Sequence, residues 1–227
     1  MDRPSNTDNY WHHRAHAFDA FYSRVGRLAP RRLVSTFLGA RTRLLERFVQ
    51  VVPQSEILDV GCGSGVHMKM LCSRCGHGGH VRGVDYSEPM VRAAARNLED
   101  SRASNWSLSV GDARSLPFRQ GTFDLVVSMG LLDYVPRPAD VLAECCRVLT
   151  DGGSMVFTIP KTPSAFFFLR TRFGNVVKEK MFDLPPIANA ISRNELEDLT
   201  RAVSLRMTHV DTVWSTMWMV RAVKMSS

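Results

Sequence analysis

Long apolar runs are missing from this chain of 227 residues. No stretch approaches the roughly 18 consecutive apolar residues that a membrane-spanning helix needs. The opening letters, MDRPSNTDNYWHH, also contain no apolar segment of the kind found in signal peptides. We therefore expect a cytoplasmic protein that does not cross a membrane. The length is enough for one well-buried α/β domain and short for two.

Cysteine and lysine are also scarce. The five cysteines are an odd number in a chain without an export signal, so they indicate reduced thiols and not a disulfide framework. Arginine supplies 24 of the 29 basic residues and lysine only 5, and the net charge is +7. Because these charges are dispersed without a long basic run, they favour a solvated basic surface over a nucleic-acid interface.

The segment Ser55–Gly65, SEILDVGCGSG, carries the strongest pattern. The apolar run Ile57–Val60 predicts a buried parallel strand, and the glycines after it predict a tight turn into a helix that begins near Val66. Asp59 would repel a phosphate group at that turn, so a cationic ligand fits better. The dinucleotide fingerprint G-x-G-x-x-G needs glycine where the chain has Val66, which counts against NAD and FAD.

Two further acids follow predicted strands. Asp85 closes the run Val81–Asp85, where a nucleoside-binding α/β fold places an acid for the ribose hydroxyls. Asp112 follows the strand-like run Trp106–Val110. The motifs D-V-G-C-G-S-G, G-V-D-Y-S, G-D-A and F-D-L-V-V, taken as a set, resemble the class I S-adenosylmethionine (SAM) dependent methyltransferases over roughly residues 55 to 224.

The resemblance implies a fold and a cofactor. The fold is a three-layer α/β sandwich with a Rossmann-like, mostly parallel seven-stranded sheet in the order 3-2-1-4-5-7-6 and added N-terminal helices. The cofactor is SAM, with its ribose on Asp85, its adenine amine on Asp112 and its adenine ring near the backbone N–H of Ala113. The residues expected at the cofactor are Asp59, Gly61, Cys62, Gly63, Asp85, Tyr86, Asp112, Ala113 and Met129.

The string GLLDYVP, which follows the fourth expected strand, predicts the acceptor side of the site. Asp133 is the candidate catalytic residue, because it could orient or deprotonate an acceptor, and Tyr134 is a candidate substrate contact. Two structural alternatives stay open, since Asp133 could cap the next turn and Tyr134 could pack under the N-terminal helices. This string and the aromatic pattern from Tyr10 to Tyr22 resemble bacterial methyltransferases related to magnesium-protoporphyrin O-methyltransferase.

Residues 1–54 are expected to form a helical lid in front of the SAM-binding domain, residues 55–227, within one structural domain. Helices are predicted from about Asn9 to Leu28 and from Arg31 to Val51. His16 in the first helix is a candidate substrate contact. The outward face of the second helix is expected to carry Arg41, Arg43 and Arg47.

Two groups of side chains could ligate a metal. One is the helical set His12, His16 and Asp19, and the other is the run of Cys72, Cys75, His77 and His80. The first set lacks a further ligand and is better explained by solvent-facing or core histidines. The second coincides with an expected helix-to-strand connection, and its histidines are too close together for the usual zinc spacing. We therefore expect no bound metal.

The remaining pattern completes an alternating α/β chain. Further helices are predicted at Val66–Arg74, Pro89–Leu98 and Ala139–Leu149, and after a capping box at Ser192–Glu195. Further strands are predicted at Phe123–Ser128, Met155–Ile159, Arg206–Val213 and Thr216–Lys224, with a turn at Asp151–Gly153. The aromatic run Ala165–Leu169 is expected either to line a pocket or to pack in the core.

These observations favour SAM-dependent methyl transfer to a small-molecule acceptor whose reacting atom could be O, N, C or S. One alternative is a nucleic-acid or protein methyltransferase. The chain lacks the string (D/N/S)-P-P-(Y/F/W) by which amine methyltransferases of nucleic acids hold a flipped base. The other alternative is a SAM-binding protein that transfers no methyl group.

Overall fold

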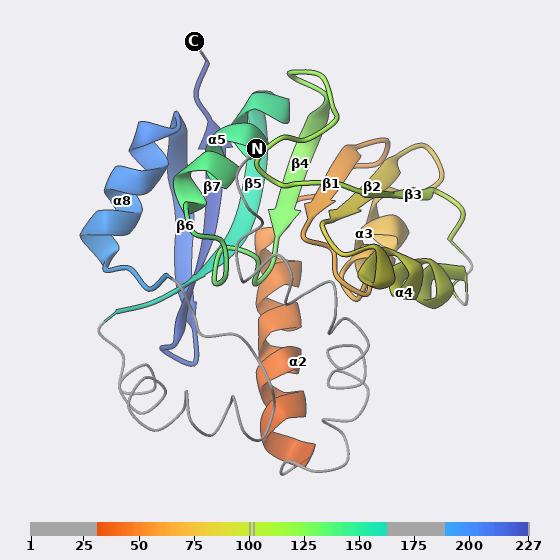
Figure 1. Ribbon diagram of the computed structural model, residues 1–227, viewed down its shortest axis with the longest axis horizontal. Helices are drawn as coiled ribbons and strands as arrows, with labels where there is room; N and C mark the ends of the chain where they lie inside the picture. The colour runs from red at the N-terminus through yellow and green to blue at the C-terminus, as the bar shows by residue number, and fades with distance from the viewer. Residues whose placement is uncertain (1–30, 100, 102, 163–188, 227) are drawn as a thin grey trace.

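The computed structural model describes residues 31–99, 101, 103–162 and 189–226. These residues form one sheet with helices on both faces (Figure 1). The strands are β1 (Glu56–Val60), β2 (His80–Asp85), β3 (Trp106–Val110), β4 (Phe123–Ser128), β5 (Leu149–Pro160), β6 (Leu205–Val213) and β7 (Met217–Lys224). The helices are α2 (Arg31–Phe48), α3 (Met68–Cys75), α4 (Glu88–Glu99), α5 (Pro138–Val148) and α8 (Arg193–Ala202). None of these helices is long and apolar enough to cross a membrane.

The sheet has the order β3-β2-β1-β4-β5-β7-β6, which confirms the predicted topology. β1 pairs in parallel with both β2 and β4, and β7 runs antiparallel between β5 and β6. The chain moves outward from β1 to β3 and then returns to build β4 on the other side of β1. In open α/β sheets a ligand crevice forms outside the carboxyl ends of the strands at such a reversal.

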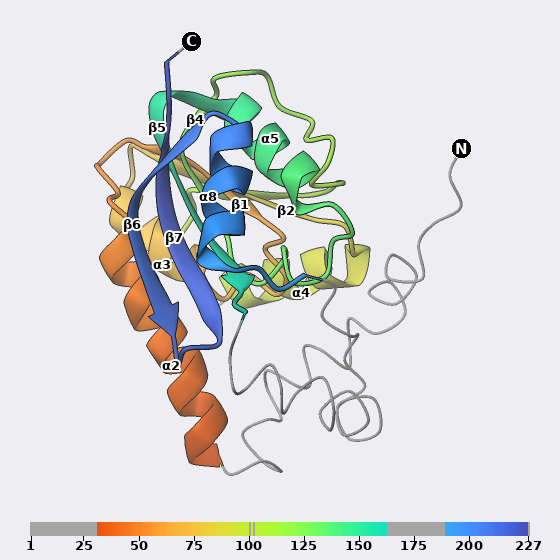
Figure 2. The same ribbon diagram turned by 90° about the vertical axis from the view of Figure 1, so that its left-hand side faces the viewer.

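Two hydrophobic clusters cover the two faces of the sheet. Leu45 of α2, Leu71 of α3 and Leu98 of α4 are buried in one cluster. Leu142 of α5 and Leu196 of α8 are buried in the other. Figure 2 shows α2 and α8 on opposite sides of the sheet. Each such leucine contributes about 1.5–3 kcal/mol by burial, so α2 belongs to the same packed unit as the sheet.

The segment Asp151–Gly153 corrects one prediction. It was expected as a turn before a strand beginning at Met155, but it lies inside β5, which begins at Leu149. The pairing of β4 with β5 changes register between Phe123 and Leu125, so the extra residues form a bulge. A glycine pair in a strand pattern is compatible with either structure, and only the pairing with β4 distinguishes them.

The C-terminal part follows the predictions closely. Ser192 accepts a hydrogen bond from the backbone N–H of Glu195, and the Glu195 side chain bonds back to the N–H of Ser192, so the capping box is present. β6 and β7 form the predicted hairpin. The expected helix at 9–28 and the aromatic run at 165–169 lie outside the described residues.

Candidate functional site

The turn after β1 is fastened to β2. The N–H groups of Gly61 and Cys62 both donate to the carbonyl oxygen of Val84, at 2.8 and 3.1 Å. Gly63 has a φ of +53°, and a side-chain carbon placed there would meet no atom within 4 Å. The backbone of Gly63 therefore borders open space beyond the carboxyl end of β1, where a ligand can approach closely.

Asp85, at the end of β2, holds the same turn. Its Oδ2 accepts a hydrogen bond from the N–H of Gly63 at 2.9 Å, and its Oδ1 accepts one from the N–H of Ser87 at 2.9 Å. Burial raises the pKa of this carboxyl, and the two hydrogen bonds oppose the rise. A carboxylate has about four acceptor positions, so Asp85 keeps capacity for the hydroxyl donors of a ribose.

Asp59 is the most deeply buried acid of the site. It is 2% exposed, and its Oδ2 has no hydrogen-bond partner among the described residues. Burial and the charge of Asp85 raise its pKa to about 7, while the charge of Arg41 acts in the opposite direction. An unsatisfied buried acceptor is unfavourable, so this position suits a ligand that brings a cationic donor.

Arg41 corrects the prediction that it faces outward. It is 8% exposed, and its Nη2 donates to the carbonyl oxygen of Met129 at 3.3 Å. Gly130 makes this approach possible, because a side-chain carbon there would lie 3.2 Å from Arg41 Nη1. Arg41 Nε has no partner among the described residues. A buried cation therefore lies close enough to Asp59 to influence its pKa.

His67, which the sequence interpretation did not consider, lies beside this cation. Its Nε2 is 3.3 Å from Arg41 Nη2. Burial and the charge of Arg41 lower the pKa of His67 to about 3, so its ring is neutral at ordinary pH. Cys62 is also buried, and burial and the charges of Asp59 and Asp85 keep its pKa well above the ordinary value. Neither side chain is therefore set up as a charged group or a thiolate nucleophile.

The residues expected near the adenine lie on the β2–β3 side. Tyr86 follows β2 and is 44% exposed. Asp112 follows β3, and Arg114 Nη2 lies 2.6 Å from its Oδ2. Hydrogen bonding to Arg114 lowers the pKa of Asp112, so its carboxylate is ionised and already shares its oxygens with a guanidinium. Ala113 is half-buried and packs against a core cluster. Met129, which directly follows β4, is 6% exposed, and its carbonyl oxygen accepts the hydrogen bond from Arg41 Nη2.

The turn after β4 contains both candidate acceptor-side residues, and we call residues 131–135 the acceptor turn. Asp133 is 6% exposed and Tyr134 is half-buried. The N–H of Tyr134 donates to the carbonyl oxygen of Leu131 at 3.0 Å. A side-chain carbon on Gly61 would meet Cβ of Leu131 at 3.0 Å, so the acceptor turn lies directly against the glycine turn.

The described residues contain no group of three or more His, Cys, Asp or Glu side chains that could hold a metal ion. Cys75 Sγ lies 3.2 Å from Asn105 Nδ2 and 3.6 Å from the carbonyl oxygen of Cys72. His80 Nε2 lies 3.0 Å from the hydroxyl of Ser107. The other metal candidates, His12, His16 and Asp19, lie outside the described residues, as does the substrate contact expected at His16.

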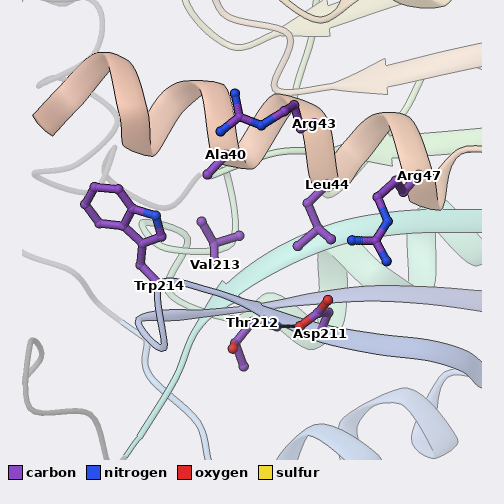
Figure 3. Close-up of a pocket in the computed structure, with 8 residues that line it drawn as sticks. All are labelled: Ala40, Arg43, Leu44, Arg47, Asp211, Thr212, Val213 and Trp214. Carbon is purple, nitrogen blue, oxygen red and sulfur yellow. Dashed lines mark hydrogen bonds between the residues drawn. The ribbon is translucent and has the colours of Figure 1, made fainter. Parts of the chain in front are cut away.

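A separate hollow of about 340 Å³ lies between α2 and the turn that joins β6 to β7 (Figure 3). Arg43 and Arg47, the two arginines that do face outward, line it. Figure 3 shows the Arg47 guanidinium and the Asp211 carboxylate on facing sides, so opposite charges partly balance there. Among the described residues, none of those expected at the cofactor or the acceptor lines this hollow.

Comparison with known proteins agrees with this geometry. Residues 57–153 match the family model described as a methyltransferase domain. The chain is 35% identical over 125 residues to a ubiquinone biosynthesis O-methyltransferase of Hahella chejuensis (strain KCTC 2396), covering 52% of this chain and 48% of the relative. It is 35% identical over 130 residues to a nocamycin O-methyltransferase of Saccharothrix syringae, covering 57% and 46%. The matched region thus spans about half the length of these relatives.

A solved structure extends the likeness of the fold. The SAM-dependent methyltransferase from Aquifex aeolicus superposes with a TM-score of 0.64 at 20% identity, covering 80% of this chain and 87% of that one. The family model matches the residues that carry the predicted motifs, and the expected fold is confirmed by the sheet order. Neither relative nor this structure is named as a porphyrin methyltransferase, so that narrower resemblance stays a prediction.

Proposed function

We propose that this chain is a SAM-dependent methyltransferase acting on a small-molecule acceptor, a proposal supported by the match of residues 57–153 to the methyltransferase domain model. One observation carries the proposal. Beside an open glycine turn the chain buries a carboxylic acid and a guanidinium, and each has a polar atom, Asp59 Oδ2 and Arg41 Nε, that finds no partner in the part of the chain that the structure describes. Opposite charges held close together suit the amino and carboxylate groups of a zwitterionic amino-acid moiety. SAM has such a moiety, and NAD does not.

The remaining cofactor contacts follow the strand ends. Asp59 would accept from the amino group, Arg41 would donate to the carboxylate, and Asp85 would accept from the ribose hydroxyls. Gly63 offers a backbone that a ligand can approach without meeting a side chain. By resemblance, Asp112 would accept from the adenine amine, alongside the guanidinium of Arg114.

When bound, SAM supplies a methyl group already activated by its sulfonium. The chain must hold the acceptor in line with that methyl group and keep water away, which is mainly a matter of positioning. Asp133, which is buried in the acceptor turn, would orient an acceptor hydroxyl and remove its proton. Tyr134, next to it, would contact the body of the acceptor.

An oxygen nucleophile on a small molecule is the acceptor class that we favour. Two relatives are named as O-methyltransferases of small molecules, in ubiquinone biosynthesis and for nocamycin. A hydroxyl acceptor gains most from a nearby carboxylate base, because it loses a proton on methylation. A nucleic-acid acceptor is less well supported, since the flipped-base string is missing from the sequence.

The test is a mass-spectrometric search for methylated products. The protein is incubated with SAM and a small-molecule extract, and each new species one methyl group heavier than its precursor is identified. Asp133→Asn should lower the rate at least tenfold, about 1.4 kcal/mol of barrier, without changing SAM affinity. Asp124→Asn is the matched control, because Asp124 is an exposed acid at the opposite end of β4. SAM binding with no methylated product, or a methylated product found only in a macromolecular fraction, would contradict the proposal.

A further inference from the structure

One side-chain amide, that of Asn189, bridges the acceptor turn. Asn189 Nδ2 donates to the carbonyl oxygen of Leu132 at 2.8 Å and to that of Val135 at 2.6 Å. The contact joins segments more than fifty residues apart in sequence. The two carbonyls belong to residues on either side of Asp133 and Tyr134, so the amide holds both ends of the stretch that carries the candidate acceptor residues.

The local sequence explains why the turn needs an external donor. A carbonyl in a helical turn normally accepts from the N–H four residues further along the chain. For Leu132 that residue is Pro136, which has no N–H to donate. The primary amide of asparagine carries two N–H donors. Asn189 therefore supplies, from outside the turn, the hydrogen bond that Pro136 cannot donate to Leu132, and its amide also bonds the carbonyl of Val135.

The amide is itself mounted on the sheet through Ile191. The N–H of Ile191 donates to the carbonyl oxygen of Pro160 at 3.0 Å. Its carbonyl oxygen accepts from the N–H of Thr162 at 2.9 Å and from the indole Nε1 of Trp218 at 2.9 Å. Pro160 ends β5 and Trp218 lies near the start of β7. Ile191, two residues after Asn189, therefore attaches this segment to two strands of the sheet.

We infer that Asn189 is a positioning residue for the acceptor: it fixes the acceptor turn relative to the end of β5 and the start of β7. This inference rests on the proposed function, because it assumes that the acceptor turn faces the methyl acceptor. Asn189 acts through Asp133 and Tyr134 and lies outside the set of residues proposed to bind the cofactor. Loss of its donors should therefore impair use of the acceptor and leave the cofactor in place.

Three substitutions separate hydrogen-bond donation from packing. Asn189→Ala removes the amide, and Asn189→Asp keeps its shape but presents oxygens to the two carbonyls. Asn189→Gln keeps both donors on a longer stem and serves as the rescue variant. Asn105→Ala is the matched control, because the Asn105 amide also donates to backbone carbonyls, those of Cys72, Gly76 and Gly79 beside the remote α3–β2 connection.

Amide hydrogen exchange of the full chain with S-adenosylhomocysteine bound measures how firmly Asn189 holds the acceptor turn, and it needs no acceptor. Exchange in peptides containing residues 131–135 should be at least about tenfold faster for the Ala and Asp variants, and close to the parent for Gln and for the Asn105 control. S-adenosylhomocysteine affinity should be unchanged in all four. With 3,4-dihydroxybenzoate as probe acceptor, kcat/KM should fall at least about tenfold for Ala and Asp and recover for Gln.

Unchanged exchange in the acceptor turn of the Ala and Asp variants would overturn the inference, as would a loss of S-adenosylhomocysteine affinity equal to the loss of transfer. The two proposals fail separately. Suppose that the exchange pattern is as expected but the parent methylates neither the probe nor any extract component. Asn189 then fixes the turn at residues 131–135 as inferred, and the proposed function is wrong.

Discussion

Gly63 is the residue at which the proposed cofactor would approach the backbone of the glycine turn. Its φ is positive, and a side-chain carbon there would point into the open space that we propose the cofactor occupies. Gly63→Ala should therefore weaken SAM at least about tenfold, by steric exclusion added to backbone strain. Titration calorimetry measures the affinity.

Gly121 provides a control, because its backbone also has a positive φ. Its φ is +65° and a side-chain carbon there also meets nothing within 4 Å, but it lies before β4, away from the site. Gly121→Ala should lose a similar amount of stability and keep its SAM affinity. Equal SAM affinities in the two variants would show that the space beside Gly63 is not used by the cofactor.

Asp59 makes stability depend on pH in a specific direction. Its pKa in the folded chain is raised from 3.8 to about 7, chiefly by burial and then by Asp85. Its favourable contribution is complete below pH 3.8 and is lost as the pH rises to about 7, because the folded state then keeps a proton that the unfolded state releases. Asp59→Asn removes this dependence.

Urea unfolding of the parent and of Asp59→Asn at about pH 5 and about pH 8 checks this sign. The stability of the Asn variant relative to the parent should be greater at the higher pH. A relative stability of Asp59→Asn that falls with rising pH would mean that Asp59 is held as a stabilised carboxylate.

At the scale of single elements, α2 is both a core helix and part of the site. Arg41 points from it to the end of β4, while Arg43, two residues on, is exposed. Arg41→Met keeps an apolar stem but removes the cation, and should weaken SAM at least about tenfold through loss of a charged hydrogen bond to its carboxylate. Arg43→Met should leave binding unchanged in the same calorimetric titration. An affinity for Arg41→Met within twofold of the parent would restrict Arg41 to a packing role.

The strands were more predictable than the arginines. β3 and β4 have the predicted bounds. In β4 a short apolar run between turn signals specifies a buried strand, whereas β3 is an edge strand in which apolar and polar residues alternate. Arg41 was assigned to the surface because arginine is usually exposed. Its position three, four and seven residues before Leu44, Leu45 and Phe48 places it on their buried stripe, which was a usable signal. The contact of Asn189 with the acceptor turn had no local signal, since it depends on distant segments meeting in the fold.

At the scale of the whole molecule, the reversal of strand order organises the site into two halves. β1 and β2 bring Asp59, Gly63 and Asp85 together on the cofactor side. β4 and β5 carry the acceptor turn, through Leu131 against Gly61 and through Asn189 to the end of β5. Such an arrangement lets the acceptor half change with substrate while the cofactor half is kept.

The central claim is that the crevice beyond β1 and β2 binds SAM, and titration calorimetry with S-adenosylhomocysteine and with NAD tests it most directly. The account predicts that the parent protein binds S-adenosylhomocysteine and not NAD. It also predicts that Asp85→Ala weakens this binding by about 1–3 kcal/mol, while Asp124→Ala, which removes a carboxylate bonded to the N–H of Glu56 at the other end of the sheet, does not. NAD binding tighter than S-adenosylhomocysteine, or equal affinities in the two variants, would contradict the account.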